Sequence, residues 1–289
     1  MNTNDLLKSL YPISVRRDVC LKDYCRYKTG GNAAAMVFPK TADELKRAVT
    51  ALKGVAPYFV LGGGSNVLIS DKGFSGAVIS TLKLDKIELK GNLCVAGAGA
   101  KISDVIRAAA INSLSGLEFA VGIPATVGGA VAMNAGCYNK SVSDAVLYVV
   151  TENGVYKKGE CGFNYRASRF LGKETILEVC FNFFPAYFDD IEEKIKAYKS
   201  FRKNPKGRSC GSVFKNDGFF AGKVIDEAGL KGKRIGGAKV SDEHANFIIA
   251  DSGATSKDIY DLIKFVKKKV LEEKNLTLLE ELVYLGEFE

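Results

Sequence analysis

A single histidine, His244, is present among the 289 residues, and the signatures of several common enzyme classes are missing. No grouping of histidine and cysteine supports a zinc site. A Ser-His-Asp triad would have to use His244, and no G-x-S-x-G turn is present. The P-loop pattern G-x-x-x-x-G-K-[ST] is absent too. We therefore expect no metal site, and we interpret His244 as a hydrogen-bonded core or hinge residue rather than a catalytic base.

Long apolar runs are also missing. No uninterrupted apolar stretch approaches the roughly 20 residues that span a bilayer. The first residues, Met1–Asp5, do not lead from a basic region into an apolar one, as a secretory signal does. The seven cysteines are odd in number and form no C-x-x-C pair, which is typical of reduced, structural thiols. We expect a cytoplasmic protein that does not bind membranes.

The net charge of +8 admits either a nucleic-acid surface or a site for anionic small molecules. Basic residues cluster only briefly, at Lys231–Arg234 and Lys267–Lys269, and no exposed aromatic residues are interleaved with them. We interpret most of this charge as a solvated face and expect no nucleic-acid partner. A phosphorylated ligand would still benefit from it.

What the sequence does contain is a pair of glycine-rich segments without charge. Residues 121–136 hold four glycines and one proline, and Leu61–Asn66 holds three consecutive glycines after an apolar strand. Glycine lets backbone N–H groups approach a ligand closely. Two such loops suit the diphosphate of a dinucleotide better than a lone phosphate. The alternative is that both are tight turns or close-packed crossings in a core.

Helical and extended patterns alternate along the chain, which predicts an α+β protein of two or three domains. Thr41–Glu44 has capping-box form and opens a helix, and Asp189 begins a basic amphipathic helix that marks the main domain boundary. The other expected helices lie along Ile102–Ala110, around Val224 and along Ile259–Val270. The expected strands are Tyr58–Leu61, Ala77–Ser80, Leu93–Ala96, Val146–Thr151, Thr175–Phe184, Asn246–Ala250 and Leu282–Leu285. Gly97-Ala-Gly99 imitates a Rossmann fingerprint, but Ile102 occupies the place of its third glycine.

Three further segments carry side chains suited to chemistry. Tyr165 and Arg166 place a phenol beside a fixed cation, which suits an oxyanion or enolate. Gly211–Asn216 alternates polar and apolar residues and puts Ser212 near Lys215, and Glu280–Tyr284 begins the last strand with carboxylates. Taken singly, each is also compatible with an ordinary surface strand.

Together and in this order, the motifs resemble those of the UDP-N-acetylenolpyruvoylglucosamine reductase family, MurB, of bacterial cell-wall synthesis. The resemblance runs from about residue 20 to the C-terminus. It is carried by Tyr27–Asn32, Leu61–Asn66, Gly122–Ala130, Met133–Gly136, Tyr165-Arg166, Gly211–Asn216 and His244–Phe247.

The resemblance implies a flavoenzyme with a two-lobed FAD-binding unit of the PCMH/vanillyl-alcohol-oxidase type and a C-terminal α/β substrate domain. The expected FAD-binding unit is 1–188, with lobes of about 1–81 and 82–188, and the substrate domain is 189–289. NADPH would reduce the bound FAD. The reduced flavin would then pass hydride to the vinyl carbon of UDP-N-acetylglucosamine enolpyruvate, giving UDP-N-acetylmuramate. We expect a monomer whose only partners are these small molecules.

Matching the family motifs residue by residue implies a site. Arg166 would stabilise the enolate, Ser212 would donate the proton, and Glu281 would partner the same intermediate. Tyr165, Lys215 and Asn216 would contact substrate. FAD would be bound by Gly62, Gly63, Gly64, Ser65, Asn66, Gly122, Ile123, Pro124, Thr126, Gly128 and Gly129. The N–H groups of Gly63, Gly64 and Gly128 are expected to face the diphosphate, and valine at Gly64 or Gly128 would then give folded apoprotein.

The sequence departs from the family pattern at three places. Ala125 replaces a usual glycine, so either its φ is ordinary or the flavin contact is looser there. Asp217 stands where the family usually has a proline after F-K-N, and the pair Leu279-Glu280 stands where it usually has Glu-Pro. Glu281 is aligned by its five-residue spacing to Gly286, and Glu280 remains an alternative. The chain has the length of the family's shorter subtype. A related FAD oxidoreductase acting on an alcohol or sugar lactone, and a non-catalytic nucleotide-binding regulator, are the other interpretations.

Overall fold

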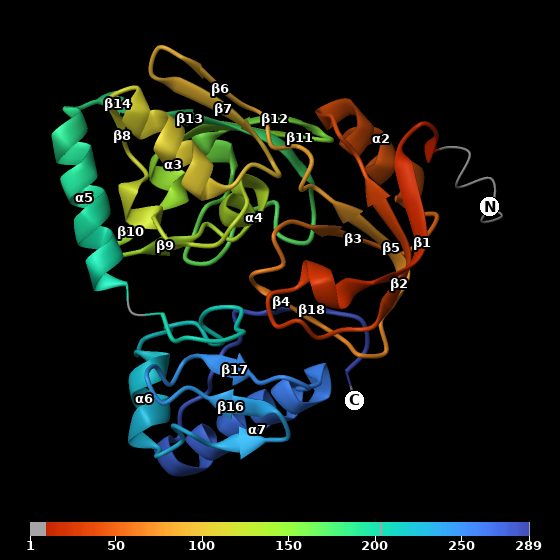
Figure 1. Ribbon diagram of the computed structural model, residues 1–289, viewed down its shortest axis with the longest axis vertical. Coiled ribbons are helices and arrows are strands. Elements are labelled where there is room, and N and C mark those ends of the chain that lie inside the picture. Colours follow the sequence, from red (N-terminus) through yellow and green to blue (C-terminus); the bar gives the residue numbers. More distant parts are fainter. Residues whose placement is uncertain (1–9, 203, 289) are drawn as a thin grey trace. The chain divides into compact units, whose positions relative to one another are not determined.

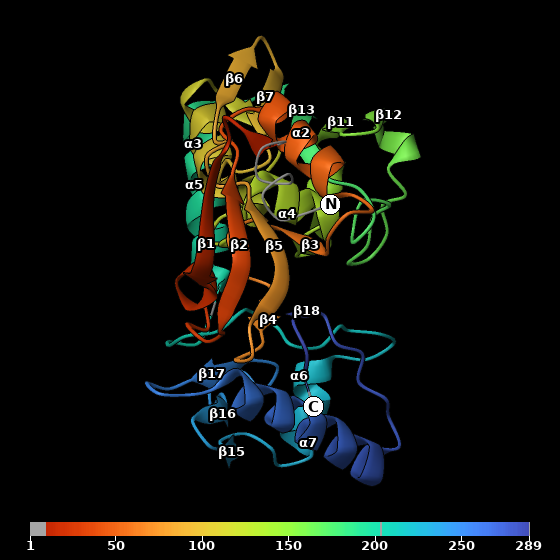
Figure 2. The ribbon, with the colours of Figure 1, turned by 90° about the vertical axis from the view of Figure 1, so that its right-hand side faces the viewer.

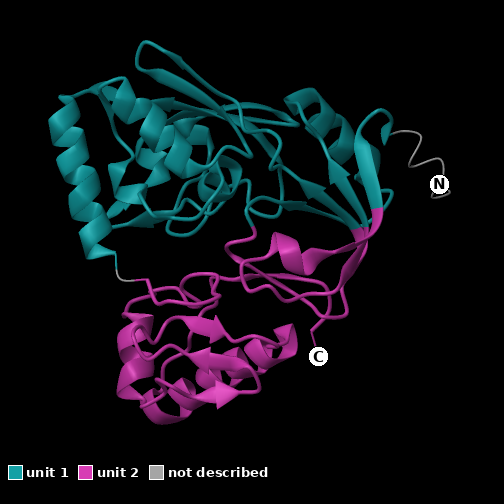
Figure 3. Ribbon diagram, viewed as in Figure 1, with its two compact units in different colours: residues 1–16, 35–63, 77–203 teal, residues 17–34, 64–76, 204–289 magenta. Residues whose placement is uncertain are grey.

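The computed structural model of the chain describes residues 10–202 and 204–288. It divides into two compact units, each built from three stretches of sequence (Figure 3). Unit 1 consists of residues 1–16, 35–63 and 77–203, and unit 2 of residues 17–34, 64–76 and 204–289. The boundaries fall inside the strands β1 (Ser14–Cys20), β2 (Asn32–Phe38) and β5 (Phe74–Ser80). The sequence predicts the main domain boundary at Asp189, whereas the compact unit 1 continues through the helix that begins there, whose Ile191 and Ile195 are buried in the core of that unit. The division into an FAD-binding part, 1–188, and a substrate-binding part, 189–289, stays a prediction.

Strands from the first part of the chain form a four-stranded sheet in the order β1-β2-β5-β3. Figure 2 shows β1, β2 and β5 side by side. Strand β3 (Tyr58–Leu61) runs parallel to β5, and the helix α2 (Ala42–Leu52) lies between β2 and β3 in sequence. The apolar stripe of α2 packs with strand side chains in one buried cluster, whose members include Val37, Leu45, Val49, Leu52 and Ile79. This periodic stripe explains why the segment is helical.

A five-stranded antiparallel sheet forms the second part of unit 1 (Figure 1). Its order is β12 (Gly154–Lys157), β11 (Val146–Thr151), β13 (Ile176–Asn182), β7 (Leu93–Gly97) and β6 (Ile87–Lys90). The helices α3 (Ile102–Ile111), α4 (Val127–Ala132) and α5 (Phe188–Phe201) bury apolar residues in the same core as the inner strands. Two short ribbons complete the unit, β8 (Leu114–Ser115) with β14 (Phe184–Pro185) and β9 (Gly136–Cys137) with β10 (Lys140–Ser141).

Unit 2 contains a small antiparallel sheet of β15 (Arg234–Ile235), β16 (Ala238–Val240) and β17 (Ile248–Ala250). The helices of this unit are α6 (Ala221–Glu227) and α7 (Ser256–Lys274). Thr255 and Asp258 form a capping box at the start of α7. The last strand, β18 (Val283–Leu285), pairs in parallel with β4 (Val67–Ile69), which follows the first glycine loop. The C-terminal strand therefore lies beside the end of the first glycine loop. Asn66 of that loop and Glu281 are in contact although 215 residues separate them in the sequence.

The helices and strands expected from the sequence are present, with ends shifted by a few residues, and the α+β class is confirmed. Thr41 caps α2 by accepting a hydrogen bond from the N–H of Glu44. Glu44 reaches back to the N–H of Lys40, not to that of Thr41 as a strict capping box would have it. Gly211–Asn216 forms isolated bridges rather than a regular strand. No described helix is long and apolar enough to cross a membrane.

Candidate active site

The two predicted glycine loops meet in unit 1. A β-carbon on Gly62 would collide with the hydroxyl of Thr126, and one on Gly63 would lie 3.8 Å from the carbonyl oxygen of Pro124. Glycine at position 62 is therefore required by the close approach of the two loops. Residues about 60 positions apart in the sequence form one surface there, as the dinucleotide interpretation requires.

Backbone donors remain available on the first loop. Within the ranges that the structure describes, no hydrogen bond uses the N–H groups of Gly63, Gly64 or Ser65. Gly63 is exposed, and a β-carbon there would meet nothing closer than ordinary van der Waals contact. Consecutive N–H groups beside such an open position suit an anionic ligand. The residues present therefore fit a bound diphosphate.

Gly128 does not fit the predicted role of diphosphate donor. Its N–H donates to the carbonyl oxygen of Ala98 at 2.8 Å, and its Cα faces the same residue, since a β-carbon would lie 3.0 Å from the Cβ of Ala98. Gly128 lets α4 approach the end of β7 closely, so the expectation that its N–H faces the cofactor is wrong. Valine at 128 would disturb packing before it disturbed a ligand.

Gly64 is a backbone requirement of the loop itself. Its φ is +59°, and a β-carbon would collide with the carbonyl oxygen of Tyr24. A left-handed φ is costly for other residues. A valine at 64 would therefore be strained whether or not a ligand is bound, and the expectation that this variant still folds stays a prediction.

Gly63 and Gly64 are neighbours and allow a matched comparison. Gly63→Ala is expected to fold with a melting temperature close to that of the parent chain but to lose FAD affinity, because the added methyl group would occupy the open face of the loop. Gly64→Ala is expected to be destabilised by about 1–3 kcal/mol or more through backbone strain. Thermal unfolding and the flavin absorbance of the purified proteins measure both effects. Full FAD content in folded Gly63→Ala would show that the loop does not bind the cofactor.

Ala125 settles one of the alternatives posed by the sequence. Its φ is not among the left-handed values of the chain, and its carbonyl oxygen accepts a hydrogen bond from the N–H of Ile102 at 3.0 Å. Alanine is therefore accommodated without strain where the family pattern has glycine. Gly122, three residues earlier, has a φ of +79° and lies against the side chain of Arg202.

Arg166 occupies the tip of a tight turn in unit 1. The N–H groups of Asn164 and Ala167 each donate to the other residue's carbonyl oxygen, at 3.0 and 3.2 Å. Arg166 has a φ of +50°, an uncommon value for a non-glycine residue. Its guanidinium donates to the carbonyl oxygen of Gly136 at 2.9 Å and lies 5.2 Å from the ring centroid of Tyr165. A strained residue with a fixed charge is typical of functional sites.

In unit 2 the structure brings together three of the predicted segments. The side-chain amide of Asn66, in the first glycine loop, donates to the carbonyl oxygen of Glu281 at 3.0 Å. The N–H of Glu281 donates to the carbonyl oxygen of Val213 at 2.8 Å, next to Ser212. The backbone of Glu281 is thus fixed between the first glycine loop and the serine segment, which is Gly211–Asn216.

Asn246 holds the serine segment from the other side, and the sequence interpretation gave it no role. Its side-chain amide binds both backbone groups of Phe214, accepting from the N–H at 2.9 Å and donating to the carbonyl oxygen at 2.8 Å. Its own carbonyl oxygen accepts from the N–H of Val213 at 2.8 Å. Asn246 is 4% exposed, so these bonds are sheltered from water. The side chain replaces a strand partner where the ladder is interrupted.

The two candidate glutamates have different surroundings. The Glu280 carboxylate forms an ion pair with Lys267 of α7 at 2.6 Å. Burial raises the pKa of Tyr284, and the nearby Glu280 carboxylate raises this pKa further. Glu280 thus has structural partners within unit 2. Neighbouring side chains of an extended segment point to opposite faces, which predicts that the Glu281 carboxylate faces away from the Glu280 ion pair.

Lys215 and Asn216, predicted to contact substrate, follow directly. The N–H of Lys215 donates to the carbonyl oxygen of Leu279 at 2.8 Å. The side-chain oxygen of Asn216 accepts from the N–H of Ala221 at 3.0 Å, at the start of α6. Asn216 therefore ties its own loop to a helix, and its role toward substrate stays a prediction.

His244 is a partly exposed residue of the loop between β16 and β17, whose next residues Ala245 and Asn246 are buried, and it is not itself in the core. Its Nδ1 accepts a hydrogen bond from the N–H of Asn246 at 3.2 Å, so the expectation of a hydrogen-bonded residue is confirmed and that of a core residue is wrong. Partial burial lowers the pKa of His244, and the charge of Lys231 lowers it further. Protonation at Nδ1 would also break the bond to Asn246.

Titration of this only histidine is expected to give a pKa below the usual value of about 6.5. Because the folded protein then binds this proton less well than the unfolded chain, His244 should reduce stability as the pH falls from about 6.5 towards the folded pKa, with no further effect below it. The imidazole signal in proton NMR measures the pKa directly. A value above that of a model peptide would contradict the assigned bond.

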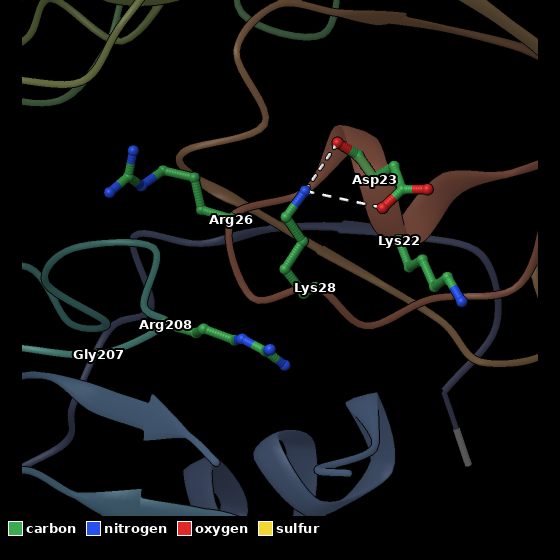
Figure 4. A pocket seen from close by; sticks show the side chains of 6 residues that line it. All are labelled: Lys22, Asp23, Arg26, Lys28, Gly207 and Arg208. Atoms are coloured by element: carbon green, nitrogen blue, oxygen red, sulfur yellow. Dashed lines mark hydrogen bonds and ion pairs between the residues drawn. The ribbon is translucent and has the colours of Figure 1, made fainter. Parts of the chain in front are cut away.

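A basic hollow of about 670 Å³ lies elsewhere in unit 2 (Figure 4). Lys28 within it donates to the carbonyl oxygen of Asp23 at 3.1 Å. The residues that line the hollow are Lys22, Asp23, Arg26, Lys28, Gly207 and Arg208. None of these is among the predicted site residues, and all of them are exposed.

Comparison with known proteins now decides the family. The C-terminal domain of UDP-N-acetylenolpyruvoylglucosamine reductase matches residues 202–285, and an FAD binding domain matches residues 33–158. The UDP-N-acetylenolpyruvoylglucosamine reductase of Caldicellulosiruptor bescii is 41% identical, over 96% of this chain and 92% of its own length. The chain belongs to the UDP-N-acetylenolpyruvoylglucosamine reductase family. It is an FAD-dependent oxidoreductase, and the predicted family is confirmed.

Other members of the reductase family agree. The reductase of Caldicellulosiruptor saccharolyticus is 42% identical, over 96% of this chain and 94% of its own length. The crystal structure of the MurB reductase from Thermus caldophilus has a TM-score of 0.84 and 38% identity, covering 95% of this chain and all of that one. The predicted fold, an FAD-binding unit followed by a reductase C-terminal domain, is confirmed. The roles of individual residues stay predictions.

Proposed function

We propose that this reductase catalyses the NADPH-dependent reduction of UDP-N-acetylglucosamine enolpyruvate to UDP-N-acetylmuramate in peptidoglycan synthesis. The observation that carries the proposal is the hydrogen-bonded connection in unit 2 from Asn66 through Glu281 to Val213. It joins the first glycine loop to the backbone that carries the Glu281 carboxylate and to Val213, the neighbour of Ser212. A carboxylate and a hydroxyl are groups that flavin-dependent reduction of an enol ether needs. In this proposal residues 1–188 bind FAD and residues 189–289 bind the UDP-sugar.

The cofactor supplies hydride taken from NADPH, and the protein supplies binding, orientation and charge. The N–H groups of Gly63, Gly64 and Ser65 would hold the diphosphate of FAD. Further FAD contacts would come from Gly62, Asn66, Gly122, Ile123, Pro124, Thr126 and Gly129. Gly128 would contribute by holding α4 in place.

Arg166 would stabilise the negative charge that develops on the substrate. Hydride addition to the vinyl carbon leaves negative charge on the adjoining carbon and its carboxylate, and a preorganised guanidinium lowers the energy of that state. A guanidinium is the most permanent of the side-chain cations, which suits this role. Tyr165 and Lys215 would orient the substrate around this charge.

Ser212 would donate the proton to the substrate carbon. A serine hydroxyl is a weak acid, so the acid must be held in place and supported by neighbouring polar groups. The bonds that Asn246 and Glu281 make to the adjoining backbone provide such a fixed frame. Glu281 would then partner the substrate intermediate.

Flavin spectroscopy tests the proposal. The purified protein should be yellow, NADPH should bleach the flavin absorbance, and UDP-N-acetylglucosamine enolpyruvate should restore it with release of UDP-N-acetylmuramate. A flavoprotein that is reduced by NADPH but is not reoxidised by this compound would reject the substrate. An alcohol or a sugar lactone that reduces the flavin would instead support the related oxidoreductase interpretation.

The two glutamates can be separated in the same assay. Glu281→Gln is expected to slow reoxidation by about 10²-fold or more, as loss of one positioned catalytic group does. Glu280→Gln should leave the rate nearly unchanged and cost at most about 1 kcal/mol of stability, because a partly exposed ion pair contributes little. Stopped-flow reoxidation and thermal unfolding measure the two effects. A larger rate loss at Glu280 would reverse the assignment.

A further inference from the structure

A buried asparagine backs the arginine turn in unit 1. Asn134 is 7% exposed, and its side-chain amide donates to the carbonyl oxygen of Asn164 at 2.9 Å. Its side-chain oxygen accepts from the N–H of Ser143 at 3.3 Å. One side chain thus joins the turn that carries Arg166 to a different loop of the same unit. A buried amide with both ends bound is held rigidly.

The segment around Asn134 contacts the turn at two more points. The carbonyl oxygen of Gly136 accepts from the Arg166 guanidinium at 2.9 Å. The carbonyl oxygen of Ala132 accepts from the hydroxyl of Ser168 at 2.7 Å. The turn is therefore fixed before its tip, at its tip and after it by one short stretch, Ala132–Gly136. The left-handed φ of Arg166 would not persist without such support.

The same stretch continues from the predicted FAD loop. Ala132 is the last residue of α4, and Thr126 caps the start of that helix, where its hydroxyl contacts Gly62. The helix is six residues long, and Gly128 fastens it to Ala98. A short fixed helix thus has the glycine loops at one end and the support of Arg166 at the other.

From these contacts we infer that Asn134 is a positioning residue for the reduction, which sets the place of the Arg166 guanidinium relative to the FAD loops. The inference rests on the proposed function, because it assumes that Arg166 acts on substrate. Asn134 touches neither substrate nor cofactor in this role. Misplacement of a catalytic group by about 1 Å can cost about 10²-fold in rate, so loss of the amide should be visible in the chemical step.

Asn134→Gly is the variant of choice. Asn134 has a φ of +43°, which glycine adopts without strain, so the change removes the amide but not the backbone conformation. Asn92→Gly is the control for loss of an amide elsewhere in unit 1, because the side-chain amide of this exposed residue donates to the carbonyl oxygen of Phe183 at 3.3 Å and to Asn182 at 2.6 Å, away from the arginine turn. If Asn134→Gly does not fold, Asn134→Ser and Ser168→Ala take its place in the same measurements.

The first measurement is a double-mutant cycle on flavin reoxidation by UDP-N-acetylglucosamine enolpyruvate. Asn134→Gly should slow reoxidation by about 10- to 10²-fold while FAD content and reduction by NADPH stay normal. Added to Arg166→Ala, it should slow the reaction by about twofold or less, because no guanidinium remains to be placed. Equal slowing with and without Arg166, or no slowing at all, would overturn the inference.

The second measurement does not depend on activity. Hydrogen exchange at the amides of Asn164 and Ala167, followed by mass spectrometry on the FAD-loaded protein, should be faster in Asn134→Gly and unchanged in Asn92→Gly. Unchanged exchange in Asn134→Gly overturns the inference whatever Arg166 does. If exchange rises as expected but Arg166→Ala reoxidises normally, the role proposed for Arg166 has failed instead, and Asn134 is then only a structural residue.

Discussion

Arg166→Ala is expected to leave flavin reduction by NADPH intact and to slow reoxidation by the enolpyruvyl substrate by about 10²- to 10³-fold, the usual loss for one preorganised charge-stabilising donor. The two half-reactions differ because only the second develops negative charge next to a carboxylate. The guanidinium is already fixed by Gly136, so little reorganisation opposes its action. Stopped-flow absorbance at the flavin band separates the two steps.

Two other arginine changes serve as controls. Arg166→Lys keeps the charge but loses the planar fork, and it should recover only part of the rate. Arg169→Ala removes a neighbouring arginine that pairs with Glu174 at 2.9 Å, and it should affect stability rather than reoxidation. If Arg166→Ala reoxidises at the parent rate, or if Arg169→Ala is the slower variant, Arg166 is not the charge-stabilising residue.

The sequence predicted most regular elements because their signals are local. The stripe Leu45, Ala48, Val49 and Leu52 marks α2 by itself, and all four residues are buried. The glycine loops were found for the same reason, since consecutive glycines after an apolar strand are a short-range pattern. The helical part of the second loop, α4, was not expected, because glycines at 128 and 129 are poor helix formers and the helix depends on tertiary contact with Ala98.

The individual tasks of the glycines could not be predicted, because they depend on what the backbone meets in space. Gly64 and Gly128 look like Gly63 in the sequence. In the structure, Gly64 avoids the carbonyl oxygen of Tyr24 and Gly128 avoids Ala98, and only Gly63 has open space beside it. Local composition identifies a close approach but not the atom approached.

The supporting asparagines were missed for a related reason. Asn134 and Asn246 stand in apolar surroundings, Met133-Asn-Ala and Ala245-Asn-Phe. A polar residue in such a place must find hydrogen-bond partners when it is buried. That signal was available in the sequence, but the partners, Asn164 for one and Phe214 for the other, lie 30 and 32 residues away. Only the fold shows which catalytic segment each asparagine supports.

Ser212→Ala is expected to bind FAD, NADPH and substrate almost normally, because a hydroxyl deletion removes little contact area. Its reoxidation step should fall by about 10²- to 10⁴-fold, the contribution of a positioned general acid. Ser212→Cys should recover part of the loss, since a thiol can also donate a proton. Ser209→Ala, three residues earlier in the same segment, is the matched control and should reoxidise at the parent rate.

Isotope labelling makes this prediction specific to the proton. In deuterated water the parent enzyme should place deuterium on the carbon attached to the ether oxygen, while the neighbouring methyl carbon receives the hydride that came from NADPH. The fixed backbone around Ser212, held by Asn246 and Glu281, should favour delivery to one face of that carbon. Ser212→Ala turning over at the parent rate with the same labelling would remove Ser212 as the acid. A water molecule held by Glu281 or Lys215 would then be the alternative proton donor.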